Sequence, residues 1–202
     1  MGRALRGRPL ASSPEMLQDA ALELFVENTY AKTTIDQITQ RAGVSRATFF
    51  NYFASKSDVL WLDLDQALER LGQELSARAS SGSPSVRLGL EKVEEALLAA
   101  AAELGADQVP LALTQYELVG SVQELQASAI ARLSDQANII TAFLTGYGMS
   151  PARARAAAYA CMAAVISGAQ EWASAGPQRD PLQGFVREAV GPIISGFVVS
   201  ET

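Results

Sequence analysis

A short segment near the N-terminus, residues 45–52 (SRATFFNY), carries side chains that are suited to reading DNA bases. Arg46 has the planar donor fork that pairs with guanine O6 and N7, and Asn51 has the amide that pairs with adenine. Thr48 and Ala47 carry methyl groups that can contact the methyl group of thymine. We therefore expect base contacts from Arg46, Thr48 and Asn51.

Other side chains of the region are suited to the phosphate backbone, whose oxygens accept hydrogen bonds from hydroxyls, ammonium groups and helix N-terminal amides. Thr34 and Lys56 each stand at the predicted start of a helix, and Tyr52 offers a further hydroxyl. Phe50 is expected to pack on a sugar or on the first helix. The complete set of predicted DNA-contacting residues is Thr34, Ser45, Arg46, Ala47, Thr48, Phe50, Asn51, Tyr52 and Lys56.

Two short helices around a tight turn are predicted to position these side chains. Thr34 and Gln37 have the spacing of a capping box, which starts the first helix at residue 35. Gly43 stands where a left-handed residue ends a helix, and Ser45 can cap the second helix. The pattern predicts a helix-turn-helix whose second helix, residues 46–52, enters a DNA major groove.

The segment from Met16 to Leu60 resembles the N-terminal domain of the TetR family of bacterial transcriptional regulators. The matching blocks are AALELF (20–25), TTIDQI (33–38), RAGVSRATFFNYF (41–53) and SKSDVL (55–60). The resemblance implies a sequence-specific DNA-binding regulator, and it implies contacts with operator DNA at the positions named above.

Two positions depart from the family pattern. Phe50 stands where the family often has a tyrosine, so a hydroxyl that could bond phosphate is missing there. Thr29 stands where a glycine is common, and we expect Asn28 to take the left-handed turn instead, because asparagine tolerates that conformation.

The remainder of the chain reads as an all-α protein, because it is rich in Ala, Leu, Gln and Glu and has little strand-like alternation. We predict a DNA-binding domain at residues 1–58 and a helical ligand-binding and dimerisation domain at residues 59–202. Caps, prolines and glycines predict about nine helices, at 14–28, 35–42, 46–52, 56–79, 84–104, 108–119, 122–146, 151–175 and 181–199.

The composition limits the possible chemistry. The chain has no histidine, which removes Ser-His-Asp and Cys-His catalysis and histidine metal ligation, and it has one cysteine, Cys161. We expect no enzyme activity, no catalytic residue, no metal and no cofactor. The net charge is −6, but residues 1–56 hold seven Lys/Arg against five Asp/Glu, so this part is mildly basic.

The chain has no uninterrupted apolar run of membrane-spanning length, and its start lacks the apolar part of a secretory signal. A cytoplasmic protein without a membrane partner is therefore expected.

The last two long helices are predicted to form a homodimer interface. Ala160, Ala164 and Gly168 lie on one line, and small residues at this spacing let helices approach closely. Residues 185–198 are apolar almost all round, and Gly191-Pro192 should kink this last helix. In the resembled family the last two long helices of each subunit pair into a four-helix bundle. A twofold dimer is in turn expected to bind an inverted-repeat operator.

The resemblance also implies a pocket for a small-molecule effector in the second domain. The candidate lining residues are Trp61, Leu97, Tyr116, Phe143, Tyr147 and Trp172, with Gln115 and Glu117 as polar candidates. The favoured function is a repressor that a ligand releases from its operator. The alternatives are an activator, or a helical protein-interaction module that has lost DNA binding.

Overall fold

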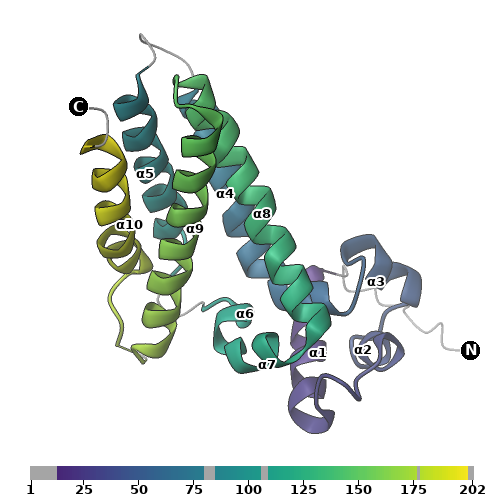
Figure 1. The fold of residues 1–202 in the computed structure, drawn as a ribbon. Coiled ribbons are helices and arrows are strands. Elements are labelled where there is room, and N and C mark those ends of the chain that lie inside the picture. The colour runs from purple at the N-terminus through teal and green to yellow at the C-terminus, as the bar shows by residue number, and fades with distance from the viewer. Residues whose placement is uncertain (1–12, 80–84, 106–108, 177, 200–202) are drawn as a thin grey trace, which may run out of the picture. The chain divides into compact units, whose positions relative to one another are not determined.

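The computed structural model describes residues 13–79, 85–105, 109–176 and 178–199, in which all regular structure is helical (Figure 1). The side chains of residues 116, 120 and 199 are not described. Within these ranges the chain forms ten α-helices and one short 3-10 helix, so the predicted all-α fold is confirmed and the count of about nine is close. The three arginines nearest the start of the chain, Arg3, Arg6 and Arg8, lie outside the described residues. The chain divides into two compact units, residues 1–62 and 63–202.

The first unit is built from three helices and the 3-10 helix around a small apolar core. Its elements are α1 (Pro14–Asn28), α2 (Ile35–Arg41), α3 (Arg46–Tyr52) and η1 (Ser57–Trp61). The buried side chains that form the core are Leu17, Ala20, Ala21, Leu24, Ile38, Phe49, Phe53 and Val59. The caps predicted at Thr34 and Ser45 are confirmed, since each accepts a hydrogen bond from a backbone amide of the helix that follows, and the Thr34–Gln37 capping box is complete. Ser13 caps α1 in the same way.

The turn after α1 contradicts the prediction for Asn28. Asn28 is the last residue of the helix, and Thr29 itself takes a positive φ of 72° with ψ 156°. The Thr29 amide donates to the Phe25 carbonyl at 2.9 Å. The position of the positive φ depends on where α1 ends, and α1 still includes Asn28. The tolerance of asparagine for a left-handed conformation therefore did not determine which residue adopts it.

The second unit is a bundle of longer helices. Its elements are α4 (Leu62–Arg78, which begins at the unit boundary), α5 (Val86–Ala102), α6 (Leu111–Thr114), α7 (Tyr116–Ser121), α8 (Gln123–Gly146), α9 (Pro151–Ser174) and α10 (Leu182–Val199). Helix α9 packs on both α8 and α10, and α10 also packs on α5. Trp172 is fully buried in this core, and its indole N–H donates to the Asp180 carbonyl at 3.0 Å.

Two predicted helices differ in the structure. The helix expected at 56–79 begins as the 3-10 helix η1 and becomes α-helical at Leu62, and the helix expected at 108–119 breaks at Gln115 into α6 and α7. Helix α8 follows its N-cap residue Val122, and the preceding Ser121 hydroxyl donates to the Leu118 carbonyl. Helix α10 continues through Pro192. None of the described helices is long and apolar enough to cross a membrane.

Candidate DNA-binding surface and effector cavity

Helix α3 has one buried and one exposed face. Phe49 is completely buried and Phe53 is 4% exposed, and together they fix α3 on the core of the first unit. The opposite face leaves Arg46, Ala47 and Asn51 exposed, together with 46% of Phe50 and 41% of Tyr52. The predicted base-reading residues Arg46 and Asn51 therefore share the exposed face, whereas Thr48 is half-buried.

The Arg46 guanidinium is held in place by two neighbours. Its Nη1 donates to Asp36 Oδ1 at 2.5 Å, and its central carbon lies 5.4 Å from the centroid of the Phe50 ring. Both the ion pair and the cation–π contact restrict the side chain to the exposed side of α3. Since Arg46 is still 58% exposed, its donor fork remains accessible to a ligand.

The hydroxyls predicted to contact DNA are used in helix caps. Ser45 Oγ accepts from the Thr48 amide at 3.1 Å and lies 2.9 Å from Thr48 Oγ1. Thr34 Oγ1 accepts from the Gln37 amide and donates to Gln37 Oε1. These bonds orient the start of each helix, where the remaining free amides favour an anion.

Lys56 points into the first unit instead of away from it. Its ammonium donates to the carbonyls of Tyr30 at 2.7 Å and Thr33 at 3.0 Å, and it lies 4.0 Å from the centroid of the Tyr30 ring. The sequence predicted a phosphate contact for this ammonium. In the structure, these bonds hold the turn between α1 and α2 against the segment after α3.

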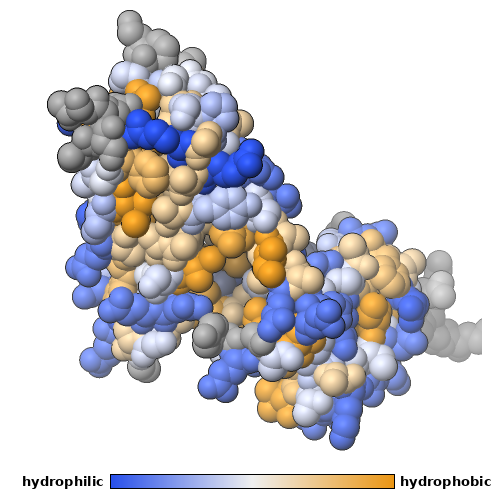
Figure 2. Space-filling view, in the orientation of Figure 1, coloured by the Kyte–Doolittle hydropathy of each residue, from blue (hydrophilic) through white to orange (hydrophobic). Residues whose placement is uncertain are grey.

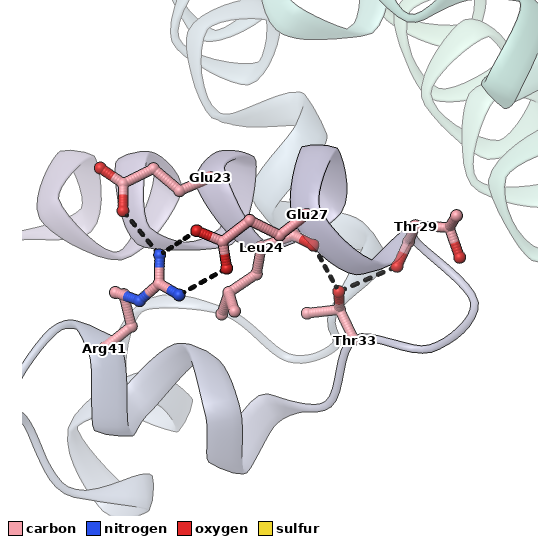
Figure 3. Close-up of polar contacts among 6 residues, drawn as sticks. All are labelled: Glu23, Leu24, Glu27, Thr29, Thr33 and Arg41. Atoms are coloured by element: carbon pink, nitrogen blue, oxygen red, sulfur yellow. Dashed lines mark hydrogen bonds and ion pairs between the residues drawn. The ribbon is translucent and has the colours of Figure 1, made fainter.

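The positive charge of Arg41 is neutralised within the first unit. Figure 3 shows its guanidinium between Glu23 and Glu27, with a bond of 2.9 Å to Glu23 and bonds of 3.0 and 2.7 Å to Glu27. These hydrogen bonds raise the pKa of Arg41 above its already high range and lower the pKa of Glu27. The same view shows the Thr33 hydroxyl donating to the carbonyls of Leu24 and Thr29, which closes the turn before α2.

The second unit contains an apolar cavity of about 60 Å³. It is lined by aliphatic and small side chains of α4, α5, α6, α9 and α10, together with Leu104. The lining residues are Leu64, Ala67, Leu68, Leu71, Leu97, Ala100, Ala101, Leu104, Leu113, Met162, Val165, Ala169, Leu182 and Val186. Such a wall offers burial of apolar surface and almost no polar partner, so it suits a hydrocarbon chain.

The predicted pocket residues are spread over several places. Leu97 lines the cavity. Tyr147 donates its hydroxyl to the Arg78 carbonyl at 3.0 Å, and Phe143 stacks against Tyr147 with ring centroids 4.9 Å apart. Trp172 is a core residue of the second unit, and Trp61 is buried at the end of η1 in the first unit. The side chain of Tyr116 lies outside the described structure.

Sequence reasoning missed Asp36, the Glu23–Glu27 pair on α1 and most of the aliphatic lining. The aliphatic residues of α4 were visible as one apolar helical face, but an apolar face alone does not show whether it borders a cavity. The acidic residues were visible as charges that favour water or a helix start. Their partners stand 10 to 18 positions away in the chain, so only the fold brings them together.

The fold and the exposed α3 together define a helix-turn-helix DNA-binding protein with a separate helical unit. Residues 17–60 match the family model described as bacterial regulatory proteins, tetR family, and residues 89–197 match the MftR C-terminal domain. The chain belongs to the TetR family and is a DNA-binding transcriptional regulator. The second match covers more than half of the chain, including the part for which only the helical layout was predicted.

Similar proteins include the mycofactocin biosynthesis regulator MftR of Mycobacterium tuberculosis, 35% identical over 65 residues. That match covers 32% of this chain and only 33% of MftR. The fatty acid metabolism regulator of Bacillus subtilis is 28% identical over 138 residues, which are 65% of this chain and 67% of the relative. The structure of Thermus thermophilus FadR, a transcriptional repressor in complex with lauroyl-CoA, aligns with a TM-score of 0.60 and 26% identity over 91% of this chain and 94% of FadR. These relatives are regulators, and they support the repressor prediction.

Proposed function

We propose that this protein binds an inverted-repeat operator as a homodimer, represses transcription there, and leaves the DNA when a fatty acyl-CoA binds its second unit. The observation that carries the effector class is the cavity of the second unit, whose wall is almost entirely aliphatic. The relatives support the same class, because T. thermophilus FadR is described with lauroyl-CoA and the B. subtilis relative regulates fatty acid metabolism.

The size of the cavity supports a mechanism for release. An apolar cavity of about 150 Å³ holds one benzene molecule, whereas this one has only about 60 Å³. A long acyl chain therefore needs the surrounding helices to move apart. Such a ligand binds the expanded state more tightly than the compact one, which is the condition for a ligand to shift a conformational equilibrium. Four residues of the wall belong to α4, so expansion is expected to displace this helix.

The proposed reading of DNA uses the exposed face of α3. Arg46 and Asn51 are assigned to base edges, Thr48 to a thymine methyl, and Phe50 and Ala47 to apolar contacts with sugars or methyl groups. Thr34, Ser45 and Tyr52 are assigned to phosphate through hydroxyls or the helix-start amides that the caps orient. Lys56 is assigned an indirect role, because its ammonium already holds two carbonyls of the first unit.

The proposed dimer interface lies on α9 and α10. Gly168 is used inside the subunit, since a Cβ atom there would come within 2.8 Å of the Phe185 carbonyl oxygen of α10. The exposed stripe of α9 lies beside the predicted line of Ala160, Ala164 and Gly168, and its residues are three or four positions apart. The stripe consists of Ala152, Ala156, Tyr159, Ala163 and Ile166. Figure 2 shows pale to orange, apolar surface over the region of α9 and α10. A stripe of small and apolar side chains at this spacing suits packing against a second copy of the same helix.

The function is tested in two steps. Selection from a random duplex pool should yield an inverted-repeat sequence with the wild type and none with the Arg46→Ala/Asn51→Ala variant. Fluorescence anisotropy on the selected duplex then measures the Kd of the protein for DNA with and without lauroyl-CoA. Coupling energies of known allosteric proteins predict a Kd that rises by about 5- to 150-fold.

The controls separate binding in the cavity from surface effects. Free coenzyme A should leave the Kd for DNA unchanged. The cavity-filling variant Ala100→Leu should keep its affinity for DNA and lose the response to lauroyl-CoA, because the added side chain occupies the space of the acyl chain. If saturating lauroyl-CoA leaves the wild-type Kd unchanged, the proposed effector is wrong. A promoter assay with the selected site placed upstream or downstream of the start point separates repression from activation.

A further inference from the structure

A surface hollow of about 540 Å³ lies beside the apolar cavity of the second unit. Its lining comes from α6, α7 and the end of α9: Leu113, Thr114, Gln115, Glu117, Leu118, Ala173 and Ser174. Leu113 lines both the hollow and the cavity. One ligand can therefore place a hydrocarbon chain in the cavity and its polar continuation in the hollow, with Leu113 at the junction.

The polar groups of the hollow are mainly hydrogen-bond acceptors. The Thr114 hydroxyl donates to the Leu111 carbonyl at 3.0 Å, and the Ser174 hydroxyl donates to the Gln170 carbonyl at 2.8 Å. Because their protons are donated to these carbonyls, both hydroxyl oxygens are left to accept hydrogen bonds from a ligand. The side-chain amide of Gln115 adds one acceptor and two donors. A ligand segment with N–H or O–H donors matches this set.

The charge of the hollow is negative. Among the lining residues whose side chains are described, Glu117 is the one acidic or basic residue, and it is exposed. A second carboxylate beside it would be repelled, with no lysine or arginine in that lining to compensate. A neutral polar group meets no such repulsion.

We propose that the hollow binds the uncharged pantetheine arm of an acyl-CoA and that Glu117 discriminates against free fatty acids. The inference rests on the proposed acyl-CoA effector. With the chain in the cavity, the thioester lies at Leu113 and the arm, with its two amide N–H groups and one hydroxyl, follows the acceptors of the hollow. The phosphates of coenzyme A lie farther along the ligand, away from this junction. A free fatty acid with its chain in the same cavity places its carboxylate at the junction, beside Glu117.

The test compares ligands that share a twelve-carbon chain and differ in the head group. Isothermal titration of the full-length protein gives the Kd of lauroyl-CoA, lauroyl-pantetheine, laurate and the neutral ester monolauroylglycerol. Lauroyl-pantetheine should bind within about threefold of lauroyl-CoA, and laurate should bind at least about tenfold more weakly. Glu117→Gln should tighten laurate several-fold and leave lauroyl-pantetheine unchanged. Glu124→Gln, which removes the same charge outside the lining, should change neither.

Each outcome decides a different point. The inference is overturned if laurate binds the wild type as tightly as lauroyl-pantetheine does. It is also overturned if Glu117→Gln does not reduce the difference in Kd between laurate and lauroyl-pantetheine. In either case the proposed acyl-CoA effector still stands if lauroyl-CoA releases the protein from DNA. A third outcome is that neither lauroyl-CoA nor lauroyl-pantetheine binds, while the neutral monolauroylglycerol binds and the charged laurate does not. That outcome supports discrimination against a carboxylate by Glu117 and shows that the proposed acyl-CoA effector is wrong. If none of the four ligands binds, both are wrong. Unchanged binding of a neutral ligand by Glu117→Gln shows that the variant has folded.

Discussion

The turn between α1 and α2 offers the sharpest test of the structural reasoning, through the substitution Thr29→Gly. Thr29 adopts φ 72° and ψ 156°, which is close to a region that only glycine occupies without strain. Its side chain is exposed, and its backbone carbonyl and amide make the hydrogen bonds of the turn. Replacing it with glycine therefore removes the strain and keeps these bonds.

The magnitude follows from two opposing terms. A residue held in a sparsely populated backbone region costs about 1–3 kcal/mol. Glycine gives the unfolded chain extra freedom, which costs about 0.4–1 kcal/mol. The first unit should therefore become more stable by about 1 kcal/mol, with an upper limit of about 2.5 kcal/mol.

The assay must report on the first unit alone, since a chain with two compact units does not guarantee one cooperative transition. Native-state hydrogen exchange at the buried residues Ile38 and Phe49 of this unit provides such a probe. Asn28→Gly is the matched control, because residue 28 is helical and glycine there should destabilise by about 0.5–1 kcal/mol. Slower exchange in the control and faster exchange in Thr29→Gly would refute the placement of the left-handed turn at residue 29.

Three further predictions concern packing, the thiol and DNA reading. Gly168→Ala should destabilise the second unit by about 1–3 kcal/mol in urea unfolding, because its Cβ would lie 2.8 Å from the Phe185 carbonyl oxygen; an unchanged midpoint would mean that α9 and α10 pack less closely. Burial raises the pKa of the Cys161 thiol to about 12, so a thiol reagent at pH 8 should leave the native protein unmodified and react after unfolding. Because the pKa of this thiol is higher in the folded state than in the unfolded state, its contribution to stability is complete below the unfolded pKa near 9 and is lost as the pH rises toward 12. Unfolding measured as a function of pH should therefore show the free energy of unfolding falling above pH 9. Arg46→Ala should relax the sequence preference at one base pair of each half-site, and Asn51→Ala should relax it at another. In anisotropy titrations each variant should lose about 1–3 kcal/mol of binding free energy for the selected duplex. Equal losses of binding free energy on an unrelated duplex would indicate phosphate contacts instead.

Local sequence determined where most helices begin and end. The residues that stop or start a helix act through their own backbone conformation or through a bond three positions away, as the caps of Thr34 and Ser45 do. For this reason α1 and α3 have the predicted bounds, and the blocks that resemble the TetR family were sufficient to indicate a DNA-binding regulator. The exposed face of α3 could also be predicted, because the burial of Phe49 and Phe53 follows from helical periodicity.

The tertiary structure decided what depends on partners distant in the chain. The sequence shows that Lys56 and Arg41 are cations, but the fold directs the first to two carbonyls and the second to Glu23 and Glu27. Helical periodicity places the aliphatic residues of α4 on one apolar face. Only the packing of α5, α6, α9 and α10 around them leaves a cavity and makes Leu113 its junction with the hollow. Helix periods and caps are properties of neighbouring residues, whereas ion pairs and cavities depend on distances between helices that no local pattern encodes.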